Sequence, residues 1–205
     1  MTGPAVPAAG GVELLWLPLG AGGRSVRWNG RVFEAVVARL EGRPVSELYH
    51  SALVVTMDGV PHVIEMGPVW QRGISGHGTV LEGPVGARWL GRSVLFRYEV
   101  RCWPHGVIPD VDEAVASPQP LSGDVRLARR LLSLVPDVPP LTWGRDESRV
   151  GEMWNSNSLI SWLLTVSGVG LDGVRLPAGG RAPGWDAGAR VARHGRCPTS
   201  PDELA

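Results

Sequence analysis

Residues 49–66 read YHSALVVTMDGVPHVIEM, two apolar runs joined by an Asp-Gly pair. Both runs are rich in β-branched residues, which favour strands. Asp58 and Gly59 both tolerate the positive φ angles that a two-residue hairpin turn requires. This stretch therefore predicts a β-hairpin, with strands over residues 50–57 and 60–66.

The predicted hairpin carries side chains suited to acid–base chemistry. His50 opens the first strand, and His62 and Glu65 lie on the second. A histidine acts as a general base when a partner on its second ring nitrogen orients the imidazole, and either His62 or Glu65 is a candidate for that partner. The alternative is a strand-edge histidine bonded to a backbone carbonyl.

About a hundred residues later, Asn155-Ser156-Asn157-Ser158 precedes a broad apolar set. The pattern predicts a helix from residue 155 or 156 to about residue 166, ended by Gly168. A helix N-terminus offers free N–H groups and a partial positive charge, which suit a hydroxyl nucleophile and a developing oxyanion. Asn and Ser are also the preferred N-cap residues, so the motif by itself favours simple capping.

Other patterns fill in the rest of the domain. Strands are predicted over residues 12–17 and 93–103 and helices over residues 31–40 and 124–134, whereas the Gly-rich residues 70–91 indicate an irregular segment. We expect an α+β fold with a small antiparallel sheet packed on helices. Its three parts are a flexible N-terminal segment (1–11), a single domain (12–190) and a loosely ordered tail (191–205).

Composition narrows the function classes. The 205 residues are 43% hydrophobic, and twenty basic residues balance twenty acidic ones, so a nucleic-acid partner is not expected. The chain contains no lysine, which excludes Schiff-base and lysine-anchored pyridoxal chemistry. Two cysteines, Cys102 and Cys197, and the lack of a signal-peptide or membrane-span pattern lead us to expect a cytoplasmic protein. The oligomeric state stays open.

The order of these motifs resembles the circularly permuted papain-like superfamily, which includes NlpC-type peptidases and lecithin:retinol acyltransferase-like enzymes. There a histidine strand precedes the nucleophile helix, and an Asn-Cys pair opens that helix. The resemblance spans about residues 48–186 and is nearest to an uncharacterised bacterial branch with an Asn-Ser-Asn-Ser/Thr helix opening. That branch also has a Tyr-Glu-Val strand, as at residues 98–100, and a Gly-x-Asp element, as at residues 184–186.

The resemblance implies a hydrolase or acyltransferase acting on an amide, thioester or ester of a small molecule, peptide or acyl substrate. Matching Asn155 to the family's Asn puts Ser156 in the place of the cysteine. Ser156 would attack and His50 would be the base. The strand pattern around residues 63–65 favours Glu65 as the orienting group, whereas counting from His50 favours His62. Backbone N–H groups near Asn157 and Ser158 would stabilise the oxyanion.

The serine is a departure from the family pattern. A thiol is readily activated as a thiolate, whereas a serine hydroxyl needs a base that removes its proton during attack. The alternative is therefore a catalytically inactive binding module that uses an apolar groove. Tyr49 and Trp154 would line that groove, and other tryptophans flank the motifs: Trp70, Trp89, Trp103, Trp143, Trp162 and Trp185.

No cofactor or metal is expected. The histidines and Glu65 lack HExxH or CxxC spacing, and the glycine-rich stretches lack GxGxxG or a Walker lysine. Cys102 lies near His105, but a buried strand cysteine is the commoner case.

Overall fold

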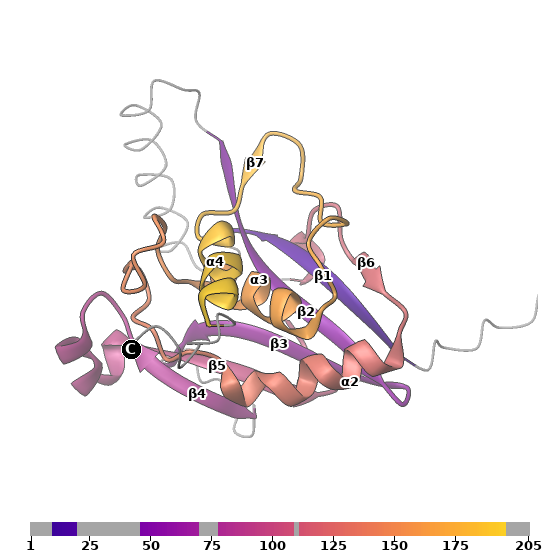
Figure 1. The fold of residues 1–205 in the computed structure, drawn as a ribbon, viewed down its shortest axis with the longest axis horizontal. Helices are drawn as coiled ribbons and strands as arrows, with labels where there is room; N and C mark the ends of the chain where they lie inside the picture. The colour runs from indigo at the N-terminus through magenta and orange to yellow at the C-terminus, as the bar shows by residue number, and fades with distance from the viewer. Residues whose placement is uncertain (1–9, 20–45, 70–77, 109–110, 196–205) are drawn as a thin grey trace, which may run out of the picture.

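The computed structural model describes residues 10–19, 46–69, 78–108 and 111–195. In this part of the chain, seven strands form a sheet in which six follow the order β4-β5-β3-β2-β1-β6 (Figure 1). Neighbours in that order are antiparallel, and β7 adds a short parallel pair to β2. The strands are β1 (Gly10–Pro18), β2 (Glu47–Met57), β3 (Val60–Pro68), β4 (Thr79–Pro84), β5 (Arg97–Pro104), β6 (Gln119–Ser122) and β7 (Gly180–Arg181).

The central hairpin forms where the sequence predicts it. β2 and β3 pair from Leu53 opposite Ile64 to Met57 opposite Val60. The two turn residues, Asp58 and Gly59, have φ angles of 51° and 77°. The turn therefore has the positive φ at both central positions that a tight hairpin needs.

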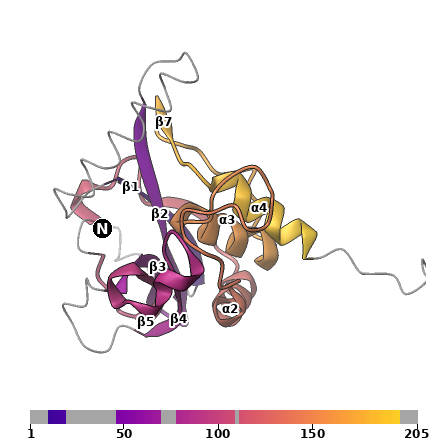
Figure 2. The ribbon, with the colours of Figure 1, turned by 90° about the vertical axis from the view of Figure 1, so that its left-hand side faces the viewer.

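The two faces of the sheet contribute to separate apolar clusters. Tyr49, Leu53 and Val55 of β2 belong to the larger cluster, which includes the helices, whereas Ala52 belongs to a smaller cluster with Leu17 of β1. This division follows the alternation of side chains along a strand. Figure 2 shows all three α-helices on one side of the sheet, so only one face has helical cover among the described residues.

Three α-helices are present in the described part of the chain. They are α2 (Val125–Leu134), α3 (Ser156–Ser167) and α4 (Trp185–His194). The Asp124 side chain caps α2 by accepting from the Arg126 N–H, and α3 ends at Gly168 with φ of 85°. The N-cap Asp124 thus marks the start of α2, and the C-cap Gly168 marks the end of α3, where the sequence predicts them.

Helices α3 and α4 approach each other closely. The face of α4 that turns inward consists of small residues: Ala187, Gly188, Ala189 and Ala192. A Cβ atom at Gly188 would overlap the Ser158 carbonyl oxygen of α3. The lack of a side chain at this position is thus a requirement of the helix contact.

Four 3₁₀ turns complete the described elements: η2 (Arg88–Arg92), η3 (Val94–Phe96), η4 (Val111–Glu113) and η5 (Val135–Asp137). The first two make up most of the connection between β4 and β5.

The α+β class is confirmed, but several boundaries differ from those predicted. β4 lies in the segment 70–91 that lacks a strand pattern, and β5 begins at Arg97, after η3, rather than at residue 93. The helix α4 (Trp185–His194) lies where the sequence predicts no helix, because its inward face is alanine and glycine rather than large apolar residues. The helix predicted over residues 31–40 lies outside the described residues.

Candidate functional site

The first turn of α3 is a complete capping box. The Asn155 side-chain oxygen accepts hydrogen bonds from the backbone N–H groups of Asn157 and Ser158, at 2.9 and 3.2 Å. The Ser158 hydroxyl in turn accepts a bond from the Asn155 N–H at 3.1 Å. Two helix N–H groups that lack partners within the helix are thereby satisfied. Capping is thus a realised role of this motif.

The same motif also holds the segment that leads into α4. Asn155 Nδ2 and Asn157 Nδ2 donate to the Pro183 carbonyl at 2.8 and 3.0 Å. The Ser158 and Ser161 hydroxyls donate to the next two carbonyls, those of Gly184 and Trp185, at 2.7 and 2.5 Å. We call these four side chains, of the N-cap Asn155 and of Asn157, Ser158 and Ser161 in α3, the carbonyl clamp.

The carbonyl clamp brings together two short motifs that lie far apart in the sequence. Gly184, the N-cap of α4, has φ of 83°, and a Cβ atom there would come within 2.6 Å of the Asn155 side chain. Only glycine combines that backbone angle with that close approach. The Asn-Ser-Asn-Ser opening and the Gly-Trp-Asp element thus contact each other directly.

Asn157 also bonds α3 to the sheet. Its Nδ2 donates to the Tyr49 carbonyl at 2.9 Å, and its Oδ1 accepts from the Ser51 hydroxyl at 2.9 Å. The three side chains are all buried. Tyr49 and Ser51, two residues apart on β2, therefore lie on the sheet face that carries α3.

His50 lies between them and so points to the other face. Its neighbour across the sheet is Leu17, a member of the smaller apolar cluster on the face away from the helices. Burial lowers the pKa of His50 to about 4, so the imidazole is neutral at pH 7. The strand alternation does not bring this imidazole to Ser156.

The two candidate orienting residues have other positions. Glu65 faces the same side as Val63, and its carboxylate accepts from Arg101 at 2.9 Å. Arg101 also binds the buried Glu99, whose second oxygen accepts from Thr79 at 2.6 Å. Glu65 is therefore part of a buried ionic network on the face away from the helices.

His62 lies far from His50 on the hairpin. It pairs with Val55, five residues along β2 from His50, which corresponds to about 17 Å of strand. Its Nδ1 lies 3.1 Å from the Val60 carbonyl oxygen. His62 is thus far along the hairpin from His50, and Ser156 belongs to α3, which packs on the opposite face of β2 from His50.

Ser156 occupies the first position of α3, and its side chain is 6% exposed. Its hydroxyl makes no hydrogen bond in the part of the chain that the structure describes.

Trp154 is fully buried, and its indole N–H has no hydrogen-bond partner among the described residues. Its neighbour Tyr98 has a pKa raised to about 12, chiefly by burial.

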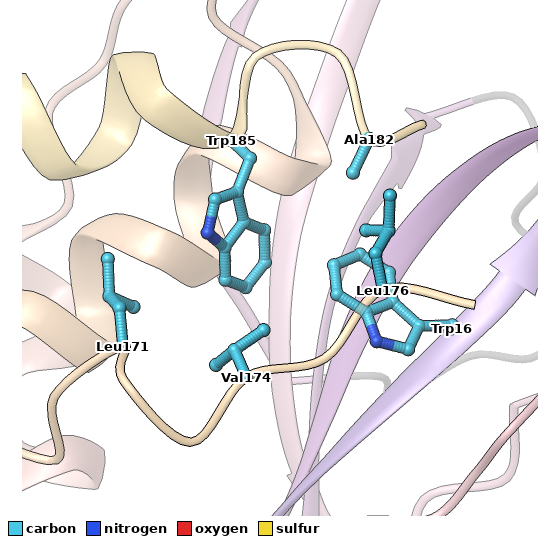
Figure 3. A pocket seen from close by; sticks show the side chains of 6 residues that line it. All are labelled: Trp16, Leu171, Val174, Leu176, Ala182 and Trp185. Carbon is cyan, nitrogen blue, oxygen red and sulfur yellow. The ribbon is translucent and has the colours of Figure 1, made fainter. Parts of the chain in front are cut away.

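A cavity lies beside the segment that the carbonyl clamp holds. Its volume is about 280 Å³, and Figure 3 shows its lining of Trp16, Leu171, Val174, Leu176, Ala182 and Trp185. The rings of Trp16 and Trp185 lie 5.0 Å apart at 49°, and the Trp16 indole donates to the Arg175 carbonyl at 2.9 Å. We call this cavity the tryptophan pocket.

The sequence reveals only part of this pocket. Trp185 is among the tryptophans that flank the motifs, but Trp16 is predicted only as a strand residue. Loop residues such as Leu171 and Val174 carry no pattern of their own. The signal that identifies the pocket is the contact between the Gly-Trp-Asp element and α3, which appears only in three dimensions.

The free cysteine and the other possible metal ligands do not form a second candidate site among the described residues. Burial raises the pKa of the Cys102 thiol, which disfavours the thiolate. The described residues bring no three His, Cys, Asp or Glu side chains together as a metal site. Within the same residues, no helix is long and apolar enough to cross a bilayer.

Comparisons with models of protein families, with curated proteins and with solved structures find no match to this chain. The functional argument therefore rests on the geometry of the chain itself.

Proposed function

We propose that this chain is a binding module in permuted papain-like order, in which the tryptophan pocket accepts an apolar group and the nucleophile-position helix serves as scaffold. One observation carries the proposal: Ser51, not His50, faces α3 and bonds to Asn157 at 2.9 Å. A general base must come within hydrogen-bond reach of the proton that it removes. On the α3 side of β2 that position is held by a serine.

The arrangement of motifs supports the permuted papain-like order. The histidine strand β2 precedes the helix α3, and α3 packs directly on β2 through Asn157. The side chains expected to support a nucleophile instead bond to backbone groups of β2 and of the segment before α4. Asn155, Asn157 and Ser158 then contribute to ligand binding indirectly, by holding the wall of the pocket that carries Trp185.

The lining of the pocket defines the class of ligand. All six lining side chains are apolar or aromatic, and the indole N–H of Trp185 makes no hydrogen bond within the described residues. A cavity of about 150 Å³ with apolar walls accepts benzene, so 280 Å³ suits an indole ring or a medium-length acyl chain. A free indole N–H beside it would donate to a carbonyl or carboxylate of the same ligand.

The test is to titrate the protein with indole and with octanoate and to measure binding from the shifts of the protein's NMR signals. Ala182→Leu fills the pocket without removing any hydrogen bond described for the chain, because the alanine side chain points into the cavity (Figure 3). We expect this variant to weaken binding at least about tenfold, since the cavity volume is lost. Val107→Leu, at a residue that is 72% exposed and outside the pocket, is the matched control. Equal binding by wild type and Ala182→Leu would contradict the proposal.

Catalysis through Ser156 is the second candidate, favoured by one specific observation. The Ser156 hydroxyl has no hydrogen-bond partner in the described structure and lies at the positive end of α3. In this alternative, the chain is a hydrolase or acyltransferase with His50 as base, oriented by Glu65 or His62. It requires the His50 imidazole to reach the opposite face of β2.

A fluorophosphonate probe separates the two candidates. The binding proposal expects no more labelling of the wild type than of Ser156→Ala. Labelling that Ser156→Ala abolishes, with Ser133→Ala as a control at an exposed helical serine, would establish a working nucleophile instead.

A further inference from the structure

The connection between β4 and β5 exposes a group of large apolar side chains. Trp89 is 71% exposed and Leu95 is 65% exposed, and Val94 and Phe96 are also exposed. All four belong to η2 and η3, which lie at one end of the sheet beyond β4 (Figure 1). We call this segment, residues 88–96, the apolar lobe. Such clustering on a projecting segment indicates an interaction surface.

The base of the apolar lobe is firmly attached to the body of the domain. Gly86 donates its N–H to the Trp143 carbonyl at 2.9 Å, and Arg145 donates to the Gly86 carbonyl at 2.7 Å. Arg88 forms an ion pair with Glu147 at 2.8 Å. These contacts hold the apolar side chains in an exposed arrangement, so binding would require little reordering.

The charged residues within the apolar lobe and its immediate flanks are all arginines. Residues 86–97 contain Arg88, Arg92 and Arg97 and no acidic residue. Arg88 and Arg97 pair with glutamates from neighbouring segments, whereas Arg92 forms no ion pair within the described residues. The lobe thus combines exposed aromatic and aliphatic groups with one arginine, Arg92, that makes no ion pair in the described part of the chain.

We propose that the apolar lobe inserts into the surface of a membrane that contains anionic lipids. Tryptophan prefers the boundary between headgroups and acyl chains, and neighbouring arginines are attracted to anionic headgroups. A short projection with apolar side chains can enter the outer few ångströms of a bilayer without a spanning helix. This inference is independent of the tryptophan pocket, because the two surfaces share no residue.

Vesicle sedimentation tests the proposal with the full chain. Phosphatidylcholine vesicles are compared with vesicles in which about a third of the lipid is phosphatidylglycerol. We expect binding to the anionic vesicles that weakens at high salt, and a loss of at least about tenfold in the Trp89→Ala/Leu95→Ala variant. Arg92→Gln should weaken binding to anionic vesicles alone. Val107→Ala, an equally exposed apolar site outside the lobe, should bind as the wild type does.

Three results would overturn the proposal. One is equal sedimentation of the wild type and the Trp89→Ala/Leu95→Ala variant, and another is an equal loss in Val107→Ala. The third is self-association of the wild type, measured by light scattering without vesicles and abolished in the double variant, which would assign the lobe to a contact between protein copies. Thermal unfolding of each variant checks that these exposed substitutions leave the fold intact.

Discussion

At the scale of single residues, Asn157 joins three segments of the chain through one amide. It bonds to the Ser51 hydroxyl, to the Tyr49 carbonyl and to the Pro183 carbonyl, and it is 3% exposed. Asn157→Ala would remove these bonds from the Ser51 hydroxyl and the Tyr49 carbonyl, whereas the Pro183 carbonyl would keep its bond from Asn155. We expect the free energy of unfolding to fall by about 3 kcal/mol, measured by urea denaturation.

Ser51→Ala provides the comparison, because it removes only one of those bonds. It should cost about 1 kcal/mol. In the double variant the two losses should be less than additive, since the bond between the residues is counted once. Additive losses would mean that the Ser51 to Asn157 bond contributes nothing to stability.

The lowered pKa of His50 predicts a dependence of stability on pH. Its pKa is about 4 in the folded chain and 6.5 when unperturbed, so between these values the unfolded chain binds a proton that the folded chain does not. The free energy of unfolding should therefore fall as pH drops from 6.5 to 4, by up to about 3 kcal/mol.

His50→Leu should remove this part of the pH dependence. Glu147, whose pKa is lowered to about 2 first of all by its hydrogen bond to Arg88, loses its contribution only below its ordinary 4.5. Denaturation at pH 6.5 and 4.5 therefore separates the histidine from the glutamate. A wild type and a His50→Leu variant with the same pH dependence would show that the pKa of His50 is not lowered in the folded chain.

At the scale of elements, the contact between α3 and α4 depends on Gly188. Gly188→Ala would place a methyl group on the Ser158 carbonyl oxygen. We expect a loss of at least about 2 kcal/mol in the free energy of unfolding, because the two helices must separate to accept it. Gly173→Ala is the matched control, since a Cβ there meets nothing within 4 Å, and it should leave stability nearly unchanged. Equal effects of the two substitutions would contradict the close packing.

Elements with local signals could be predicted from the sequence. Asp58 and Gly59 determine the hairpin turn, and Asn155 and Gly168 mark the ends of α3 through cap chemistry. The helix α4 was missed because its buried face is small rather than hydrophobic. That face is explained only by the proximity of α3, which is a tertiary contact.

The arrangement of the candidate site is harder to predict from the sequence than the helices and strands are. The order of His50 and Ser156 along the chain says nothing about which face of β2 carries the imidazole, and a shift of one residue reverses the face. Ser51, next to His50, is the residue that meets α3. The spacing of residues along the chain therefore does not give the orientation of their side chains, which a site needs.

At the scale of the whole molecule, the protection of backbone amides from hydrogen exchange should decrease from the centre of the sheet to its edges. β2 has β1 and β3 on its two sides, and its Leu53 and Val55 are fully buried. The terminal strands β4 and β6 have one neighbour each. We expect amides of β2 to exchange slowest and those of β6 among the fastest of the strands, measured by hydrogen exchange with mass spectrometry. Slow exchange throughout β6 would contradict this ranking.

The carbonyl clamp recognises backbone oxygens rather than side chains, which makes it largely indifferent to the sequence that it holds. Asn155, Asn157, Ser158 and Ser161 bond to three successive carbonyls, so these bonds themselves require only glycine in the second place, while the helix that follows must keep its small inward face. The side chains of residues 181–183 are in that sense free to vary while the backbone path is kept. Descendants of this chain could therefore alter the wall of their pocket by replacing one short segment, while the rest of the domain stays unchanged.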